Sequence, residues 1–275
     1  MIADTQYFLH SQMWTVIHRT LGHRLTWYTE PLEVGEWQSQ DVKDRPEMVT
    51  RELMNVSFQF PVPTSPTDLQ ELLKPNLPWA EDHFQERVSA SPMNPPPSER
   101  YWPFAQRGNS DHKDGDQFSH TYPERMWPKF ANVGNVAPNG RQVFVPHMGV
   151  RFEYGDLQDV VNLLRKSPLT RQAYLPIWFP EDTGNVSGVR VPCTLGYQFI
   201  VRNGAIHIIY HMRSCDFLRH FPDDVYMAAR LLQWVCEEAF WQRVIDVGTL
   251  TMHIGSLHVF QGDMPRMETD YAPKP

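Results

Sequence analysis

The chain has 275 residues, of which 41% are hydrophobic and 12% aromatic, and its formal net charge is −7. This length suffices to bury the core of one large domain or two small ones. The acidic balance, without any run of basic residues, argues against direct nucleic-acid binding, because duplex-binding proteins carry a basic patch or stripe. No segment approaches the roughly 20 consecutive apolar residues of a transmembrane helix, so no membrane partner is expected.

The N-terminal half combines predicted regular elements with proline-rich loops. Apolar residues spaced through positions 1–30 predict a helix, and the partial alternation over 49–60 predicts a strand. The proline-rich stretches 61–66 and 92–103 are predicted loops, and the polar stretch 106–117 is predicted to be a mobile surface loop.

The C-terminal half has clearer periodicity. Asp156 is placed to cap a helix whose apolar face is formed by Leu157, Val160, Val161 and Leu164. Residues 195–213 predict two strands joined at Asn203-Gly204, a dipeptide typical of two-residue hairpin turns. A long buried helix is expected over 224–244 and a strand over 249–260. This mixture, without internal repeats, predicts a single domain of α/β or α+β class over residues 1–275.

The cysteine content bears on the compartment. The three cysteines form no C-x-x-C pair, which favours free thiols in a reducing environment. The first residues have neither a basic region nor an apolar signal core. We therefore expect a cytoplasmic protein.

The most informative motif surrounds Cys193. This cysteine follows Pro192, and Gln198-Phe199 come five and six residues after it. Arg213-Ser214-Cys215-Asp216 then follows the predicted hairpin. A lone cysteine is more often a buried core residue than a nucleophile. The combination, however, resembles the active-site core of the thymidylate synthase superfamily, strongly over 170–262 and in patches over 44–130.

The resemblance implies a fold and a chemistry. The fold would be a single α+β domain, a mixed β-sheet packed with helices, and a homodimer formed through the sheet. Cys193 would be the catalytic nucleophile that adds to carbon 6 of a pyrimidine, so that carbon 5 can accept a one-carbon unit from 5,10-methylenetetrahydrofolate. The thiolate is the reactive form, and Arg213 or Arg171 is placed to stabilise it.

Arginines are expected to hold the nucleotide phosphate, because the planar guanidinium can donate two hydrogen bonds to one anion. Arg213 is the first candidate, together with the Ser214 hydroxyl. Arg171 matches a family arginine that reaches across the dimer into the neighbouring site, although the second arginine of the family pair is Gln172 here. Arg45 is a weaker match, and Arg51 is its rival.

Asp224 is the residue that selects the base under this resemblance. It lies eleven residues after Arg213, where the synthase has an asparagine that recognises uracil. A carboxylate accepts a hydrogen bond from the 4-amino group of cytosine but faces a carbonyl in uracil. The same exchange marks bacteriophage deoxycytidylate hydroxymethylases, which share Cys-Thr at the nucleophile and the motif Gly-Ser-Leu-His-Val. Alternatively, Asp223 or Asp224 caps the following helix.

Further positions match the family individually. Glu81 matches the catalytic glutamate that also serves the folate, with Glu86 as its rival. Tyr122 matches a catalytic tyrosine, and Asp216 matches an aspartate that contacts folate. The remaining substrate-binding positions are Gln198 and the sugar-contacting pair His258 and Phe260, in which Phe260 lacks the family phenol.

The sequence therefore predicts a dCMP 5-hydroxymethyltransferase of the host cytoplasm in phage infection, with 5,10-methylenetetrahydrofolate as cofactor and with Arg171 acting in trans within the homodimer. The alternatives are a dCMP 5-methyltransferase, a CMP hydroxymethylase and a non-catalytic nucleotide-binding homologue. His207 and His211 fall on a predicted strand rather than in a helical zinc motif, so no metal is expected.

Overall fold

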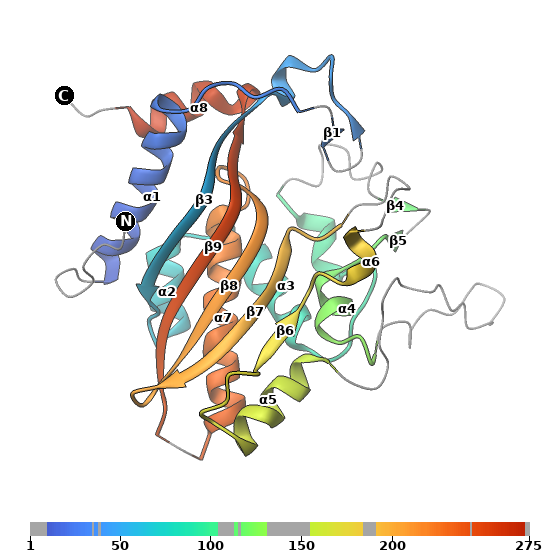
Figure 1. Ribbon diagram of the computed structural model, residues 1–275, viewed down its shortest axis with the longest axis vertical. Coiled ribbons are helices and arrows are strands. Elements are labelled where there is room, and N and C mark those ends of the chain that lie inside the picture. Colours follow the sequence, from blue (N-terminus) through green and yellow to red (C-terminus); the bar gives the residue numbers. More distant parts are fainter. Residues whose placement is uncertain are drawn as a thin grey trace.

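A five-stranded mixed sheet forms the centre of the computed structural model, which describes residues 10–34, 36–37, 40–103, 113–114, 117–130, 155–183, 191–242 and 244–272. The strand order is β3-β9-β8-β7-β6 (Figure 1). β8 and β9 pair in parallel, and the other neighbours pair antiparallel. The bounds are β3 (Thr50–Pro61), β6 (Tyr174–Pro176), β7 (Thr194–Arg202), β8 (Ala205–Asp216) and β9 (Asp246–Phe260).

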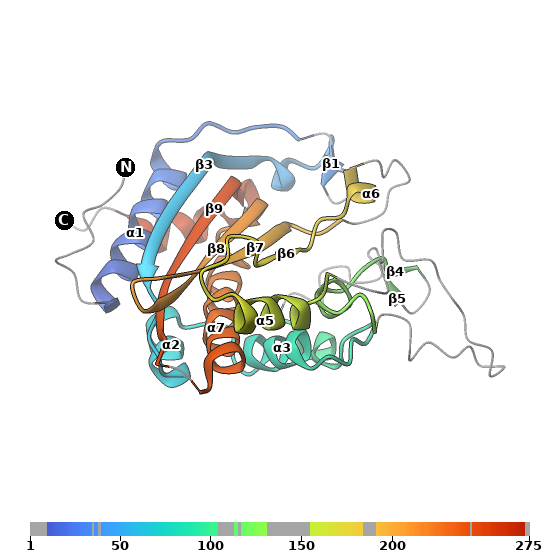
Figure 2. The ribbon, with the colours of Figure 1, turned by 60° about the horizontal axis from the view of Figure 1, so that its bottom comes forward.

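Helices cover one face of this sheet. Figure 2 shows them as a second layer beneath the strands, with the long helix α7 at its centre. The layer consists of α2 (Pro66–Leu73), α3 (Trp79–Val88), α5 (Leu157–Lys166) and α7 (Phe221–Phe240). At the edge strand β3, the structure adds α1 (His10–Trp27) and α8 (Met264–Tyr271), which pack together. The expected α+β class with a mixed sheet is confirmed.

Short elements connect these layers. Two of them, η2 and α4, contribute to the site described below. The short elements are β1 (Glu36–Trp37), β2 (Gln40–Asp41), η1 (Pro46–Met48), η2 (Pro97–Tyr101), β4 (Lys113–Asp114), β5 (Gln117–Phe118), α4 (Tyr122–Met126), α6 (Pro180–Thr183) and η5 (Gln261–Asp263). None of the described helices combines the length and apolar character that a membrane span needs.

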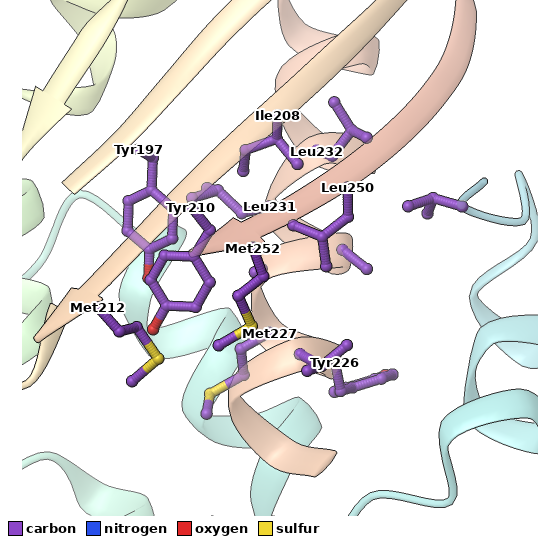
Figure 3. Close-up of a cluster of buried hydrophobic side chains, with 14 of the residues drawn as sticks. Tyr197, Ile208, Tyr210, Met212, Tyr226, Met227, Leu231, Leu232, Leu250 and Met252 are labelled. Carbon is purple, nitrogen blue, oxygen red and sulfur yellow. The ribbon is translucent and has the colours of Figure 1, made fainter. Parts of the chain in front are cut away.

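Strand alternation places the core between sheet and helices. On β8, Ile208, Tyr210 and Met212 are buried toward the helices, whereas the intervening residues are half-buried on the other face. Figure 3 shows these side chains meeting Met227 and Leu231 of α7. His207 and His211 share the face that points away from the helices, on a strand as expected.

The local signals in the C-terminal half are confirmed. Asn203 and Gly204 have φ of 53° and 80°, the left-handed conformation that a tight hairpin turn requires. Asp156 caps α5 by accepting a hydrogen bond from the backbone of Asp159, whose own side chain completes a capping box.

Some boundaries and roles differ from expectation. Helix α7 begins at Phe221 with His220 as its N-cap, so neither Asp223 nor Asp224 caps it. Helix α2 begins at Pro66, and residues 97–101 form a 3-10 helix within the predicted loop 92–103, because proline at a first helical position already has a helical φ. Most of the predicted loop 106–117, like positions 1–9, lies outside the described residues.

Candidate active site

Two adjoining cavities meet beside Cys193. The first, here called the aromatic cavity, lies among α3, η2, α4 and the start of α7 and includes Trp79, Trp102, Tyr122 and Asp224. The second, here called the polar cavity, lies against β3, β8 and β9 and includes Glu52, Arg213, Ser256 and His258. Both cavities are lined by Cys193, Ser214, Asp216 and His220.

Cys193 is held at this junction by the arginine of the neighbouring strand. Nε of Arg213 donates to the Pro192 carbonyl at 2.9 Å, and Nη2 lies 3.9 Å from Cys193 Sγ. The backbone N–H of Arg213 also donates to the carbonyl of Cys193 at 2.9 Å. The half-buried sulfur therefore has a fixed position beside a positive charge.

A chain of hydroxyl groups begins at Thr194, the residue next to Cys193. Thr194 Oγ1 donates to the Tyr122 hydroxyl at 3.3 Å and lies 2.8 Å from the Tyr210 hydroxyl. Burial raises the pKa of Tyr122, and the charges of Cys193 and Asp224 act in the same direction. Tyr122 is therefore a neutral phenol at physiological pH that can donate a hydrogen bond into the aromatic cavity.

Asp224 is half-buried at the wall of the aromatic cavity. The thiol of Cys215 donates to its Oδ2 at 3.6 Å. Burial raises the pKa of Asp224 to about 7, while the nearby charge of Arg87 opposes this shift. The carboxyl group can therefore exist in either protonation state near neutral pH, and it faces the same space as Cys193.

The polar cavity collects the groups expected to bind phosphate and sugar. Arg213, Ser214 and His258 all line it, as the motifs implied. Burial lowers the pKa of His258 to about 4, so its imidazole is neutral. Glu52 was not predicted, yet it lines the same cavity and accepts a hydrogen bond from the Ser256 hydroxyl at 2.5 Å. Its alternating strand sequence gave no sign of this role.

Flat aromatic surfaces line the aromatic cavity. Trp79 stacks on His83 with ring centroids 5.2 Å apart, and Trp102 stacks on His220 at 5.7 Å. Asp216 lines the same space, and its Oδ1 accepts hydrogen bonds from the backbone of Leu218 and Arg219. A planar heterocycle could stack here beside a carboxylate.

The structure does not bring every predicted residue to the cavities. Glu81 lies on another face of α3, where it accepts hydrogen bonds from Arg230 and Tyr226. A helix residue two positions from Trp79 points about 200° away from it, which explains the difference. Glu81 thus lines neither cavity, and its role as the catalytic glutamate stays a prediction. The other predicted residues that line neither cavity are Arg45, Arg171, Gln198 and Phe260.

These four have other surroundings. Arg45 is half-exposed and pairs with Glu47, and its rival Arg51 donates to the carbonyl of Thr29 at 2.7 Å. The exposed Arg171 accepts a hydrogen bond from Gln198 through its backbone carbonyl, on the sheet edge. Phe260 is fully buried beneath the guanidinium of Arg219, because β9 points it into a small cluster.

Glu86, the rival glutamate, is linked to the aromatic cavity instead. It accepts hydrogen bonds from the backbone N–H and the hydroxyl of Ser98, both at 2.6 Å, and lies 3.0 Å from His83 Nδ1. Ser98 and His83 line the cavity. Burial lowers the pKa of His83 to about 4, which keeps the imidazole neutral.

Sequence reasoning missed His83 and Arg87. Together with Trp79 they occur every four residues along α3, so they share one helix face. All three are buried and line the aromatic cavity. A histidine and an arginine on an otherwise buried helix face were the available signal. Across the described residues, no group of three or more His, Cys, Asp or Glu side chains is arranged to hold a metal ion.

Comparison with known proteins agrees with this architecture. The family model for thymidylate synthase matches residues 110–275. The chain is 28% identical over 116 residues to a protein of Methanosarcina mazei named "Putative thymidylate synthase". These aligned residues make up 42% of this chain and 51% of the relative. A relative of the same name from Methanosarcina barkeri is 29% identical over 109 residues, 40% of this chain and 48% of the relative.

These alignments cover only part of each protein, so that the chain spans about half the length of the relatives it matches. The family model nevertheless covers more than half of the chain, including Cys193, the β7-β8 hairpin and Asp224. The resemblance inferred from the motifs is thereby confirmed at the level of the family. The chain belongs to the thymidylate synthase family.

Proposed function

We propose that this protein is a dCMP 5-hydroxymethyltransferase. The observation that carries the proposal is the placement of a carboxyl group, Asp224, in the same cavity as the nucleophile Cys193. A carboxylate accepts from the 4-amino group of cytosine, whereas uracil would present a carbonyl to it and leave buried acceptors unpaired, at a cost of about 1–3 kcal/mol.

Cys193 starts the reaction in this proposal. Its thiolate forms a bond to carbon 6 of dCMP, and the electron pair of the ring double bond moves so that carbon 5 becomes nucleophilic. Arg213 supports the thiolate, since its Nη2 lies 3.9 Å from Sγ. The same guanidinium lines the polar cavity, where it and Ser214 are placed to bind the phosphate.

The one-carbon donor would occupy the aromatic cavity. The stacked pairs Trp79–His83 and Trp102–His220 suit a planar ring system, and Asp216 supplies an acceptor for its amino and ring N–H groups. When bound there, 5,10-methylenetetrahydrofolate supplies a one-carbon unit to carbon 5.

The later steps move protons and water. Carbon 5 would then lose its proton while the bond from the transferred carbon to the folate nitrogen breaks and tetrahydrofolate leaves with that electron pair, which gives an exocyclic methylene on the base. A water molecule then bonds to that methylene and loses a proton, while the bond from carbon 6 to Sγ breaks and its electron pair returns to Cys193. The neutral imidazole of His83, whose Nδ1 lies 3.0 Å from Glu86, lines the cavity and is placed to accept a hydrogen bond from this water. The phenol of Tyr122 is placed to hold the water by donation.

The second candidate is hydroxymethylation of CMP. It is favoured by Glu52, which pairs across the strands with His258 and lines the polar cavity beside it. A carboxylate can accept hydrogen bonds from ribose hydroxyls. His258 would contact the sugar in either case, with the phenol of the family pair replaced by Phe260. Arg171, Arg45 and Gln198 remain proposed substrate-binding residues, with Arg171 acting in trans within a homodimer.

Product analysis tests the proposal. The purified protein is incubated with 5,10-methylenetetrahydrofolate and with dCMP, CMP or dUMP, and each product is weighed by mass spectrometry. Gain of CH2O on dCMP is the expected result. Faster turnover of CMP than of dCMP would favour the second candidate function, hydroxymethylation of CMP. Gain of CH2 with oxidation of the folate would indicate a methyltransferase. Turnover of dUMP alone would contradict the role of Asp224, and the absence of any product would favour a nucleotide-binding homologue.

A further inference from the structure

Arg87 is a buried cation without an ionic partner. Only 4% of its surface is exposed, and its guanidinium carbon lies 4.2 Å from the centre of the Tyr122 ring. Nε makes no hydrogen bond. Within the part of the chain that the structure describes, no carboxylate forms an ion pair with this guanidinium. The side chain lines the aromatic cavity together with Cys193 and Asp224.

The contrast with the buried Arg125 and the half-buried Arg219 and Arg230 is informative. Arg125 donates to both carboxylate oxygens of Asp182 at 2.7 and 2.9 Å, and Arg230 donates to both oxygens of Glu81 at 3.0 and 2.9 Å. Arg219 pairs with Asp263 at 2.6 Å. Buried charges are normally paired in this way, because an isolated charge in a low-dielectric site is costly. Arg87 departs from the rule at the wall of a cavity, which indicates that a ligand completes its hydrogen bonds.

The neighbours of Arg87 restrict the ligand. The guanidinium stands close enough to lower the pKa of Asp224, of Asp223 and of Tyr122. Asp223 is not available to bind a ligand, because both of its carboxylate oxygens accept hydrogen bonds from Asn76 at 2.8 Å. Of Asp223 and Asp224, the latter is therefore the carboxyl group left to contact a ligand beside the guanidinium of Arg87, which has unused donors.

We propose that Arg87 is a specificity-determining residue that donates hydrogen bonds to the ring acceptors of cytosine while Asp224 accepts from the adjacent amino group. This inference rests on the proposed function. Cytosine presents its 4-amino donor directly beside the ring nitrogen N3, an acceptor, with the 2-carbonyl beyond it. A carboxylate and a guanidinium in that order match the edge, and Asp224 then needs no proton to bind N3.

Uracil presents the opposite pattern to the same two groups. Its 4-carbonyl would face the carboxylate, and its N3–H would face the guanidinium. One contact would place two acceptors together and the other would place two donors together, so that buried polar groups would remain unpaired. Arg87 and Asp224 would thus select the base jointly, whereas Asp224 by itself would recognise only the substituent at position 4.

The test compares binding with and without the base. Calorimetric titrations measure the affinity of dCMP, dUMP and 2-deoxyribose 5-phosphate for the wild type, Arg87→Met, Arg87→Lys and the surface control Arg266→Met. Arg87→Met should weaken dCMP binding by about 10- to 100-fold, the range for hydrogen bonds to a charged group. The affinity of Arg87→Met for the sugar phosphate should stay within about twofold of the wild type. The affinity of Arg87→Lys for dCMP should lie between those of the wild type and Arg87→Met, because lysine keeps the charge but not the planar guanidinium.

Thermal unfolding separates this role from a structural one. Loss of an unpaired buried cation should leave the Tm of Arg87→Met unchanged or raise it. A residue held for packing on Tyr122 would instead lower the Tm when it is replaced. The proposal is overturned if Arg87→Met binds dCMP like the wild type, or if it loses dCMP and the sugar phosphate equally.

The same variants keep the two proposals distinguishable. If the wild type binds dCMP through Arg87 but yields no hydroxymethylated product, the reaction is wrong and the role of Arg87 stands. If the wild type makes the product and Arg87→Met retains full affinity for dCMP, the role of Arg87 is wrong and the reaction stands. A wild type that binds dUMP more tightly than dCMP contradicts both.

Discussion

Nη2 of Arg213 lies 3.9 Å from Sγ of Cys193, while Nε of the same guanidinium donates to the carbonyl of Pro192 at 2.9 Å. One side chain at the end of β8 thus holds the segment that carries the sulfur and places a positive charge beside it. The hairpin between β7 and β8 makes this possible, since it pairs Thr194 with Met212 and brings the two residues together across adjacent strands.

Arg213→Lys should therefore impair both the nucleophile and phosphate binding. Lysine lacks the planar guanidinium that can donate to the Pro192 carbonyl and to a phosphate at the same time. Each lost charge-assisted hydrogen bond is worth about 1.5–3 kcal/mol. We expect kcat/KM to fall by at least about 10-fold and the alkylation of Cys193 by iodoacetamide to slow. Steady-state kinetics and mass spectrometry of the alkylated protein measure both effects. Arg266→Lys is the matched control, and an unchanged alkylation rate would contradict the positioning role.

Asp224→Asn should make the protein less sensitive to pH. Burial raises the pKa of Asp224 from its ordinary value of 3.8 to about 7, so between these values the folded protein keeps a proton that the unfolded chain has lost. The free energy of unfolding therefore falls as the pH rises through this window, by about 1.4 kcal/mol per pH unit at most. Urea unfolding should show a larger stability advantage of Asp224→Asn at about pH 8 than at about pH 5.

The exposed carboxylate Asp44 provides the control for that comparison. Asp44→Asn should differ from the wild type by the same amount at both pH values. Equal stability differences for Asp224→Asn at the two pH values would show that this carboxyl group is already ionised throughout the window.

Glu81→Gln and Glu86→Gln should separate stability from activity. Glu81 binds Arg230 and Tyr226 away from the cavities, so its loss should cost about 1–3 kcal/mol of stability and leave kcat within about twofold of the wild type. Glu86 orients His83 and Ser98, so its replacement should lower kcat by about 10-fold or more. Paired kcat and urea measurements check this, and a larger loss of kcat in Glu81→Gln would restore Glu81 as the catalytic glutamate.

Asp182→Asn should loosen the helix that carries Tyr122. Arg125 of α4 donates to both oxygens of Asp182, and both side chains are buried. Removal of one partner leaves a buried charge, which typically costs about 3–5 kcal/mol. Thermal unfolding should show a lower Tm, and the double variant Arg125→Met/Asp182→Leu should recover most of the loss. A Tm as low in the double variant as in the single one would assign the effect to packing.

Mixing of inactive variants tests the role of Arg171 in trans. If each site combines Cys193 of one protomer with Arg171 of its partner, a hybrid of Cys193→Ser and Arg171→Met chains contains one intact site. Random reassociation should then restore about a quarter of the wild-type activity. A mixture of Cys193→Ser with Arg213→Met should restore none, because both residues belong to the same site of one chain. No recovery in the first mixture would contradict the exchange.

Much of the fold follows from local sequence signals. The turn at Asn203-Gly204, the cap at Asp156 and the alternation along β8 each depend on residues that are close together in the chain. Local conformational preference and hydrophobic period therefore sufficed to predict these elements. The spacing of Cys193, Arg213 and Asp224 also predicted that these residues share a site, and the structure brings all three to the two adjoining cavities, while their chemical roles stay predictions.

The choice among chemically similar residues was decided only by the tertiary structure. Glu81 and Glu86 lie on the same short helix, yet only Glu86 contacts residues of the aromatic cavity. Arg87 gains its significance from the burial of a charge without a partner, a property that depends on residues distant in sequence. Helix orientation and the pairing of buried charges arise from packing among separate elements, and for that reason local sequence signals predict where the site lies in the chain but not its full set of residues.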